Sequence, residues 1–159
     1  MMAALGVKRI FAPIEAPDLR DGPVYTGWRE ARATPVCVVS LDEKGEPVAR
    51  PVIHYSRHSP TGFEWGYGGS GPADLAYAIL RDYLGQHAGQ PMSRARWHEA
   101  MDNVAEALHQ EFKSAFVTYF AERCWHLSAA SVEAWLREAR DDIWTPIETR
   151  VALGYLVKR

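Results

Sequence analysis

Residues 63–76 read FEWGYGGSGPADLA, and the interpretation of the whole chain starts from them. An aromatic, strand-like run enters a glycine turn and leaves through a proline into an apolar helix. Pro72 suits the first helical turn, because its missing N–H would have no intrahelical partner there. We expect Ser70 or Gly71 to cap this helix and Gly85 to end it. The stretch therefore predicts a corner where β structure gives way to α structure.

The chain before this corner has the apolar alternation and the turns of an antiparallel sheet. Residues 25–29 predict a strand that a glycine interrupts. Residues 35–41 and 47–55 predict the two strands of a hairpin, joined by a turn at 42–46. Residues 63–67 predict a further short aromatic strand. The N-terminal half is therefore expected to supply the sheet.

The chain after the corner has helical periodicity. Beyond the first helix, Ser93 is expected to begin a helical region that continues to the neighbourhood of Ala121. Ser128 is expected to begin a third helix that runs through Glu138. Residues 144–159 fit either a strand or a helix. Strands first and helices second predict an α+β fold, a small antiparallel sheet from the N-terminal half covered by about three helices from the C-terminal half.

The length of 159 residues predicts one domain, since domains cluster at about 100–150 residues. Residues 1–23 hold several prolines and are expected to form an N-terminal arm. Residues 24–140 are expected to form the single α+β domain. Residues 141–159 are expected to form a C-terminal tail that packs on the domain.

Composition narrows the function classes. The formal net charge is −2, so the chain has no basic excess and we expect no duplex nucleic acid as a partner. No run reaches about 18 apolar residues, so we expect no membrane partner. The N-terminus lacks the apolar region and cleavage site of a secretory signal, which predicts a cytoplasmic protein. Cys37 and Cys124 are interpreted as free thiols in a reducing compartment, with a disulfide between them as the alternative.

The glycine turn is the strongest candidate site. It can present several backbone N–H groups at the start of a helix, where anions bind. It lacks the lysine of a Walker A loop, and the alternating βαβ pattern that a dinucleotide fingerprint needs is missing around it. The alternative is a purely structural corner. The residues expected to bind a ligand are Trp65, Tyr67, Gly68, Gly69, Ser70 and Gly71, with Arg29 as the nearest counter-charge.

A second polar cluster lies on the long helical region. Residues 98–102 read HEAMD, which is similar to the zincin helix motif with Asp102 where its second histidine would stand. His98, Asp102, Glu106 and His109 share one helix face at spacings of four, four and three. This face is either a metal site or a solvated polar face, and we expect neither a metal nor a cofactor. Near the sheet edge, Arg50 and Arg57 fit a modest cationic patch.

Several stretches together resemble a known family. They are YTGWR at 25–29, the stretch at 63–76, FK at 112–113, WHLS at 125–128 and WL at 135–136. They are similar to a small family of uncharacterised bacterial, phage and plasmid proteins, classed as a domain of unknown function. The resemblance implies a compact domain found on mobile elements and carries over no catalytic residue.

These observations lead to two functional expectations. The first is a non-enzymatic binding protein of a mobile genetic element, an accessory or anti-defence factor. Its partner would be a nucleotide-like or anionic small molecule, or a host protein. The alternative is a metal-dependent enzyme acting on a phosphate-containing substrate through Glu64, Asp74 or the pair His98 and Asp102.

Overall fold

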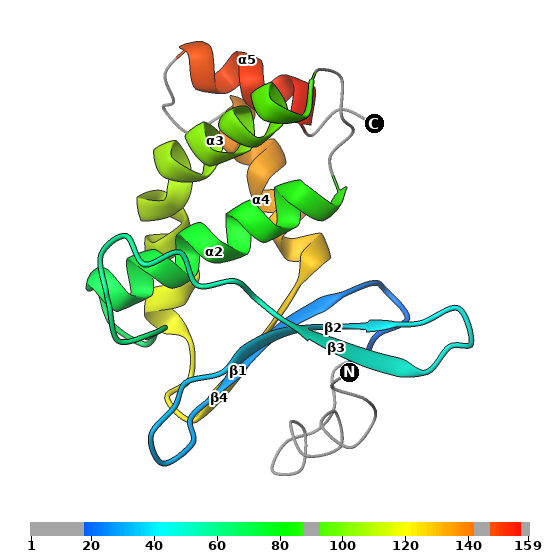
Figure 1. The fold of residues 1–159 in the computed structure, drawn as a ribbon, viewed down its shortest axis with the longest axis vertical. Helices are drawn as coiled ribbons and strands as arrows, with labels where there is room; N and C mark the ends of the chain where they lie inside the picture. Colours follow the sequence, from blue (N-terminus) through cyan, green and yellow to red (C-terminus); the bar gives the residue numbers. More distant parts are fainter. Residues whose placement is uncertain (1–17, 88–92, 142–146, 157–159) are drawn as a thin grey trace.

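The molecule has two layers, a twisted sheet and a set of helices on one of its faces (Figure 1). The computed structural model describes residues 18–87, 93–141 and 147–156. Its strands are β1 Val24–Trp28, β2 Val36–Leu41, β3 Pro47–Pro51 and β4 Cys124–Ser128. Its helices are α2 Ser70–His87, α3 Arg94–Ala115, α4 Ala129–Asp141 and α5 Ile147–Leu156, with a 3-10 turn, η1 Val117–Tyr119, after α3. The predicted α+β class is confirmed.

The sheet has the strand order β3-β2-β1-β4, and each neighbouring pair is antiparallel. Tyr25 lies opposite Val38 on one side and Leu127 on the other. This row of side chains faces the helices, because the Tyr25 hydroxyl donates a hydrogen bond to Asp82 of α2 over 2.8 Å. The sheet therefore packs its central strand directly against α2.

Gly27 shows why a glycine interrupts β1. It lies opposite Trp125 of β4. A Cβ atom added at Gly27 would lie 2.6 Å from the Trp125 indole, which is closer than real side chains approach. The indole therefore fills the space that the missing side chain leaves.

The fourth strand of the sheet is β4 and not the aromatic segment 63–67 that the sequence predicted. Residues 63–67 do not form the predicted strand, and their side chains Phe63 and Trp65 are buried. Their backbone finds other partners: the Thr34 hydroxyl donates to the Phe63 carbonyl over 2.6 Å, and the Gly66 N–H donates to the Val117 carbonyl over 3.0 Å. Because these groups are satisfied, the segment needs no ladder. The fourth strand comes instead from the C-terminal half.

Both predicted ends of α2 shift. The Ala73 N–H donates to the Gly69 carbonyl over 3.1 Å, so Gly69 caps the helix in place of Ser70 or Gly71. Pro72 still falls in the first turn, where its missing N–H costs no intrahelical hydrogen bond. The helix continues to His87 and passes through Gly85. A helix interior tolerates glycine at a cost of about 1 kcal/mol relative to alanine.

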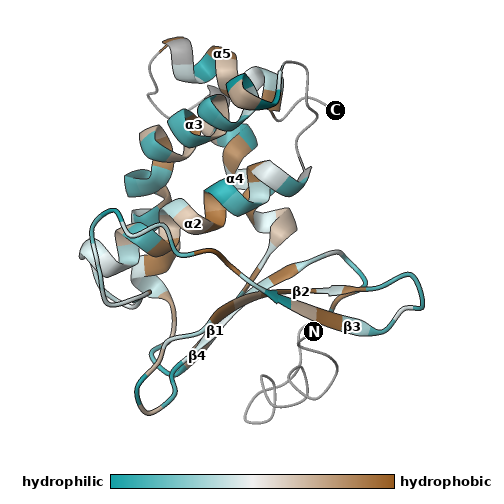
Figure 2. Cartoon of the chain, in the orientation of Figure 1, coloured by the Kyte–Doolittle hydropathy of each residue, from teal (hydrophilic) through white to brown (hydrophobic). Residues whose placement is uncertain are grey.

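The apolar core lies between the sheet and the helices. Leu75, Ile79 and Leu84 of α2 are fully buried, as are Leu108 of α3 and Leu136 of α4. Figure 2 shows apolar segments on the strands and on α2 and α4, with hydrophilic residues along much of α3. None of the described helices is both long enough and apolar enough to cross a membrane.

The predicted arm and tail fall partly outside the described residues, namely 1–17, 142–146 and 157–159. The part of the tail that the structure describes is helix α5. Leu153 and Leu156 of α5 are buried in the common core, and α5 lies against α3 (Figure 1).

Candidate functional site

The glycine turn occupies the surface between buried Trp65 and the start of α2. Gly66 has a φ of +84°, a left-handed conformation that favours glycine. A Cβ atom there would also lie 3.2 Å from the carbonyl oxygen of Phe120. The Gly66 N–H is bonded to the Val117 carbonyl, as described above. Gly66 is therefore a structural residue that anchors the turn to η1.

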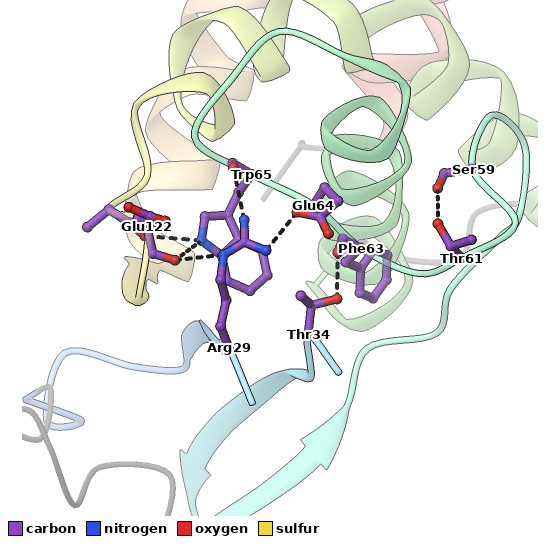
Figure 3. Close-up of polar contacts among 9 residues, drawn as sticks. Arg29, Thr34, Ser59, Thr61, Phe63, Glu64, Trp65 and Glu122 are labelled. Atoms are coloured by element: carbon purple, nitrogen blue, oxygen red, sulfur yellow. Dashed lines mark hydrogen bonds and ion pairs between the residues drawn. The ribbon is translucent and has the colours of Figure 1, made fainter. Parts of the chain in front are cut away.

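Arg29 lies beside the turn, as the sequence predicted, and it is heavily engaged (Figure 3). Its Nη1 donates to Oε2 of Glu64 over 2.8 Å, and its Nε donates to the Glu122 carbonyl over 2.9 Å. Its Nη2 donates to the Trp65 carbonyl over 3.3 Å, and the guanidinium lies 4.5 Å from the centre of a Trp65 ring. Arg29 thus joins β1, the turn and the segment before β4, and its charge is already balanced by Glu64.

Trp65 serves the core. It is 1% exposed, and its indole N–H donates to the carbonyls of Ala121 and Glu122 over 3.0 and 3.1 Å. The ring also meets Trp125 edge to face, with centroids 5.9 Å apart. Arg29 covers one face of the Trp65 ring and Trp125 packs against the ring as well. Trp65 therefore packs beneath the turn and is not available to stack on a ligand.

The other glycines of the turn, Gly68, Gly69 and Gly71, differ in whether a side chain would fit at their positions. A Cβ atom at Gly69 would lie 2.5 Å from the Tyr67 ring, and one at Gly71 would lie 2.6 Å from the Glu64 side chain. Both glycines therefore make room for neighbouring side chains. A Cβ atom at Gly68 would meet nothing within 4 Å. Tyr67 itself is 48% exposed, so its ring covers Gly69 and also faces solvent.

The backbone N–H groups of the turn are its candidate ligand-binding groups. Within the described part of the chain, the N–H groups of residues 67–71 donate to no protein acceptor. Tyr67, Gly68 and Ser70 are exposed, so their donors are within reach of a dissolved ligand, whereas Gly71 is buried. The 18-residue helix that follows has no acidic residue in its first turn. Its N-terminal dipole is therefore uncompensated there and favours an anion.

Asp74, one turn into α2, has a role that the sequence did not predict. It is fully buried, and its Oδ1 accepts the His58 N–H over 2.9 Å. Its Oδ2 accepts the Ser59 N–H over 2.9 Å and lies 3.1 Å from Nε2 of His54. The carboxylate thereby pins the loop that crosses from β3 to the turn. Its signal in the sequence is an acidic residue among the apolar residues of the first half of this helix.

Arg50 does not contribute to an open cationic patch. Its Nη1 and Nη2 donate to the two carboxylate oxygens of Asp82 over 2.6 and 2.9 Å. This hydrogen bonding raises the pKa of Arg50. Burial, together with the neighbouring Asp82 carboxylate, raises the pKa of Tyr25 well above its ordinary value. The group ties β1 and β3 to α2. Arg57 is likewise paired, with Glu106 over 2.5 Å.

The polar residues on this face of α3 contact different partners and do not form one cluster. Nε of Arg81 donates to Oδ1 of Asp102 over 2.5 Å, and its Nη2 lies 2.9 Å from Nδ1 of His98. His109 is buried and stacks on the ring of His58, with centroids 5.6 Å apart. Among the described residues, no group of three or more histidine, cysteine or acidic side chains is placed to hold a metal ion.

Comparison with known proteins adds one match. Residues 25–101 match a family of unknown function, DUF6166. The matched segment contains β1 to β3, the glycine turn, α2 and the first turns of α3, so it includes Arg29 and Asp74. No curated protein and no solved structure matches the chain. The central part of the chain is thus similar to an uncharacterised domain.

Proposed function

We propose that this chain is a non-enzymatic binding protein that holds a nucleotide-like or other anionic small molecule at the start of α2. One observation carries the proposal: the N–H groups of residues 67–70 have no acceptor in the described protein and lie at the exposed start of an 18-residue helix. An anionic oxygen there would accept these donors and complement the helix dipole.

The preference for a nucleotide-like ligand rests on a comparison of two contributions to the binding free energy. An exposed helix N-terminus contributes about 0.3–1 kcal/mol toward an anion. Arg29 adds little to this, because Glu64 already balances its charge. Stacking of a base on an aromatic ring contributes about 1–3 kcal/mol. Tyr67 offers such a ring, so we expect AMP to bind about 5- to 150-fold more tightly than inorganic phosphate.

Calorimetric titration with AMP, adenosine and inorganic phosphate tests the proposal. Ser70→Asp places a negative charge in the first turn of α2, where it repels an anion and interacts favourably with the dipole. Ser70→Asn is the matched control, because it has nearly the same shape without the charge. We expect Ser70→Asp to lose AMP binding while its thermal midpoint stays the same or rises, and Ser70→Asn to bind as the native chain does. Equal AMP affinity in the two variants would refute the site.

A host protein is the second partner class, and exposed aromatic residues favour it. Tyr119 on η1 is 78% exposed, and η1 is joined to the turn through the Gly66–Val117 hydrogen bond. Tyr67 and Tyr119 thus sit on adjoining segments, and exposed tyrosines are enriched at protein interfaces. In this version Tyr119→Ser would abolish a specific complex and leave AMP binding unchanged.

The biological setting follows from the family resemblance alone. We propose a cytoplasmic accessory or anti-defence factor of a mobile genetic element. Loss of a host-directed phenotype in a Ser70→Asp or Tyr119→Ser strain, with normal protein levels, would tie that role to this surface. A phenotype that persists in both strains would separate the role from the turn.

A further inference from the structure

The second half of α2 borders a cavity that the functional proposal above does not use. It has a volume of about 500 Å³ and lies between α2, the first two turns of α3 and the chain that leaves β3. Its lining includes Arg50, Arg81, Gly85, Arg94, Trp97 and His98. Gly85 lies about 22 Å along the helix axis from Ser70, since each residue advances the helix by about 1.5 Å. The cavity is therefore separate from the glycine turn.

We propose that this cavity binds a small organic anion with an aromatic body. Its volume falls within the range of about 300–1,000 Å³ that is usual for small-molecule sites. Buried Trp97 and Met101 contribute apolar lining, and Ile53 adds an apolar side chain that is 63% exposed. These residues suit the flat apolar part of a ligand.

The charged lining favours an anion. Among the described lining residues there are three arginines and one carboxylate, that of Asp82, on a chain whose formal net charge is −2. Arg50 is paired with Asp82, and Arg81 is paired with Asp102, which is not among the described lining residues. Arg94 makes no ion pair with any described residue. It is also the first residue of α3, whose first turn holds no acidic side chain. Arg94 and this helix end therefore supply the charge that a ligand would meet.

Arg81 organises the polar wall. Its side chain is nine-tenths buried, and its Nη2 lies 2.9 Å from Nδ1 of His98. A guanidinium can only donate, so Nδ1 of His98 accepts and the neutral ring carries its proton on Nε2. The Nε of Arg81 is fixed by Asp102. His98 is thereby held in one tautomer, and its Nε2–H is available as a donor to an anion.

Gly85 keeps the cavity open. It is an interior residue of α2 without a positive φ, so the backbone alone does not require glycine there. A Cβ atom at Gly85 would lie 3.5 Å from Nη1 of Arg81, an ordinary contact distance. A longer side chain at this position would extend from the helix into the cavity that Gly85 lines. The helix therefore accepts a destabilising residue at a point where a side chain would occupy the cavity.

Two fluorescent probes test the site. The first is 8-anilinonaphthalene-1-sulfonate, an aromatic anion, and the second is N-phenyl-1-naphthylamine, its neutral counterpart. Gly85→Leu fills the cavity and suits a helix, and Gly154→Leu in α5 is the matched control, because a Cβ atom at Gly154 meets nothing within 4 Å. Arg94→Gln removes the unpaired charge. Thermal midpoints establish that each variant is folded.

We expect the anionic probe to bind the native chain and Gly154→Leu equally, and to bind Gly85→Leu at least tenfold more weakly. Arg94→Gln should weaken the anionic probe several-fold and leave the neutral probe unchanged. Ser70→Asp should bind the anionic probe as the native chain does, which separates this site from the glycine turn. Unchanged binding by Gly85→Leu, or equal affinity of the native chain for the two probes, would overturn the proposal.

Discussion

Replacement of Asp74 should unfold the protein more readily than any other single carboxylate change among the described residues. The buried carboxylate accepts two backbone N–H groups and lies within bonding distance of His54. Asp74→Ala leaves the buried Ser59 N–H, the part-buried His58 N–H and the His54 ring without this acceptor. Removal of one partner from a buried charged network costs about 3–5 kcal/mol. For a domain of this size each kcal/mol lowers the thermal midpoint by about 2–4 °C, so the fall should be about 6–20 °C.

Urea unfolding followed by tryptophan fluorescence measures this directly. The matched control is Asp42→Ala in the turn between β2 and β3, because Asp42 also accepts two backbone N–H groups, from Lys44 and Glu46, but is exposed. Water replaces the lost acceptor there, so we expect a change of no more than about 1 kcal/mol. Asp74→Asn should fall between the two. If Asp74→Ala and Asp42→Ala cost the same, the reasoning about the buried carboxylate is wrong.

Two further predictions concern β1. Gly27→Ala places a methyl group 2.6 Å from the Trp125 indole, so it should lower the free energy of unfolding in urea by about 1–3 kcal/mol. Gly68→Ala should leave this free energy unchanged, because a Cβ atom there meets nothing within 4 Å. Equal urea midpoints for the two variants would contradict the packing argument. The pKa of Tyr25 is raised in the folded state, so its contribution to stability is complete below the unfolded-state pKa of about 10 and is lost as the pH rises through the folded value. Urea titrations between pH 8 and pH 11 should therefore show that the free energy of unfolding falls with pH, and that it falls less in Tyr25→Phe. If the free energy of unfolding has the same pH dependence in both proteins, Tyr25 is not the group responsible.

Local patterns in the sequence predicted much of the fold. The hairpin of β2 and β3 and the helix after the glycine turn depend on contacts close along the chain, and each was found near its expected position. Residues 63–67 were predicted as a strand, and Trp65 was predicted to bind a ligand, but Phe63 and Trp65 are both buried. Their segment was wrongly predicted as a strand because aromatic alternation does not reveal whether a sheet edge is available. That information lies in residues far away in the sequence.

β4 shows the same limit from the other side. It is five residues long, and its partner β1 lies almost a hundred residues earlier, as with Gly27 opposite Trp125. No turn signal links the two strands, so nothing local marks β4 as a strand. α2 was expected to end at Gly85 because glycine commonly ends helices, but packing around Leu84 outweighs a propensity of about 1 kcal/mol.

The sequence predicted where Arg29 lies but not what it contacts. Arg29 lies beside the glycine turn as expected, but sequence spacing could not show that Glu64 balances its charge. The buried role of Trp65 was also hidden, because an aromatic residue before a turn fits both a core and a stacking platform. The cavity could not be found at all, since its lining comes from three separate segments.

Chemical-shift mapping with AMP tests the central claim most directly, because it reports on the amides of residues 67–70 one by one. The proposed function predicts saturable shifts of these N–H resonances, with a smaller response to adenosine and none in Ser70→Asp. Shifts confined to other residues, or none at millimolar AMP, would show that the glycine turn is only the structural corner between the sheet and α2.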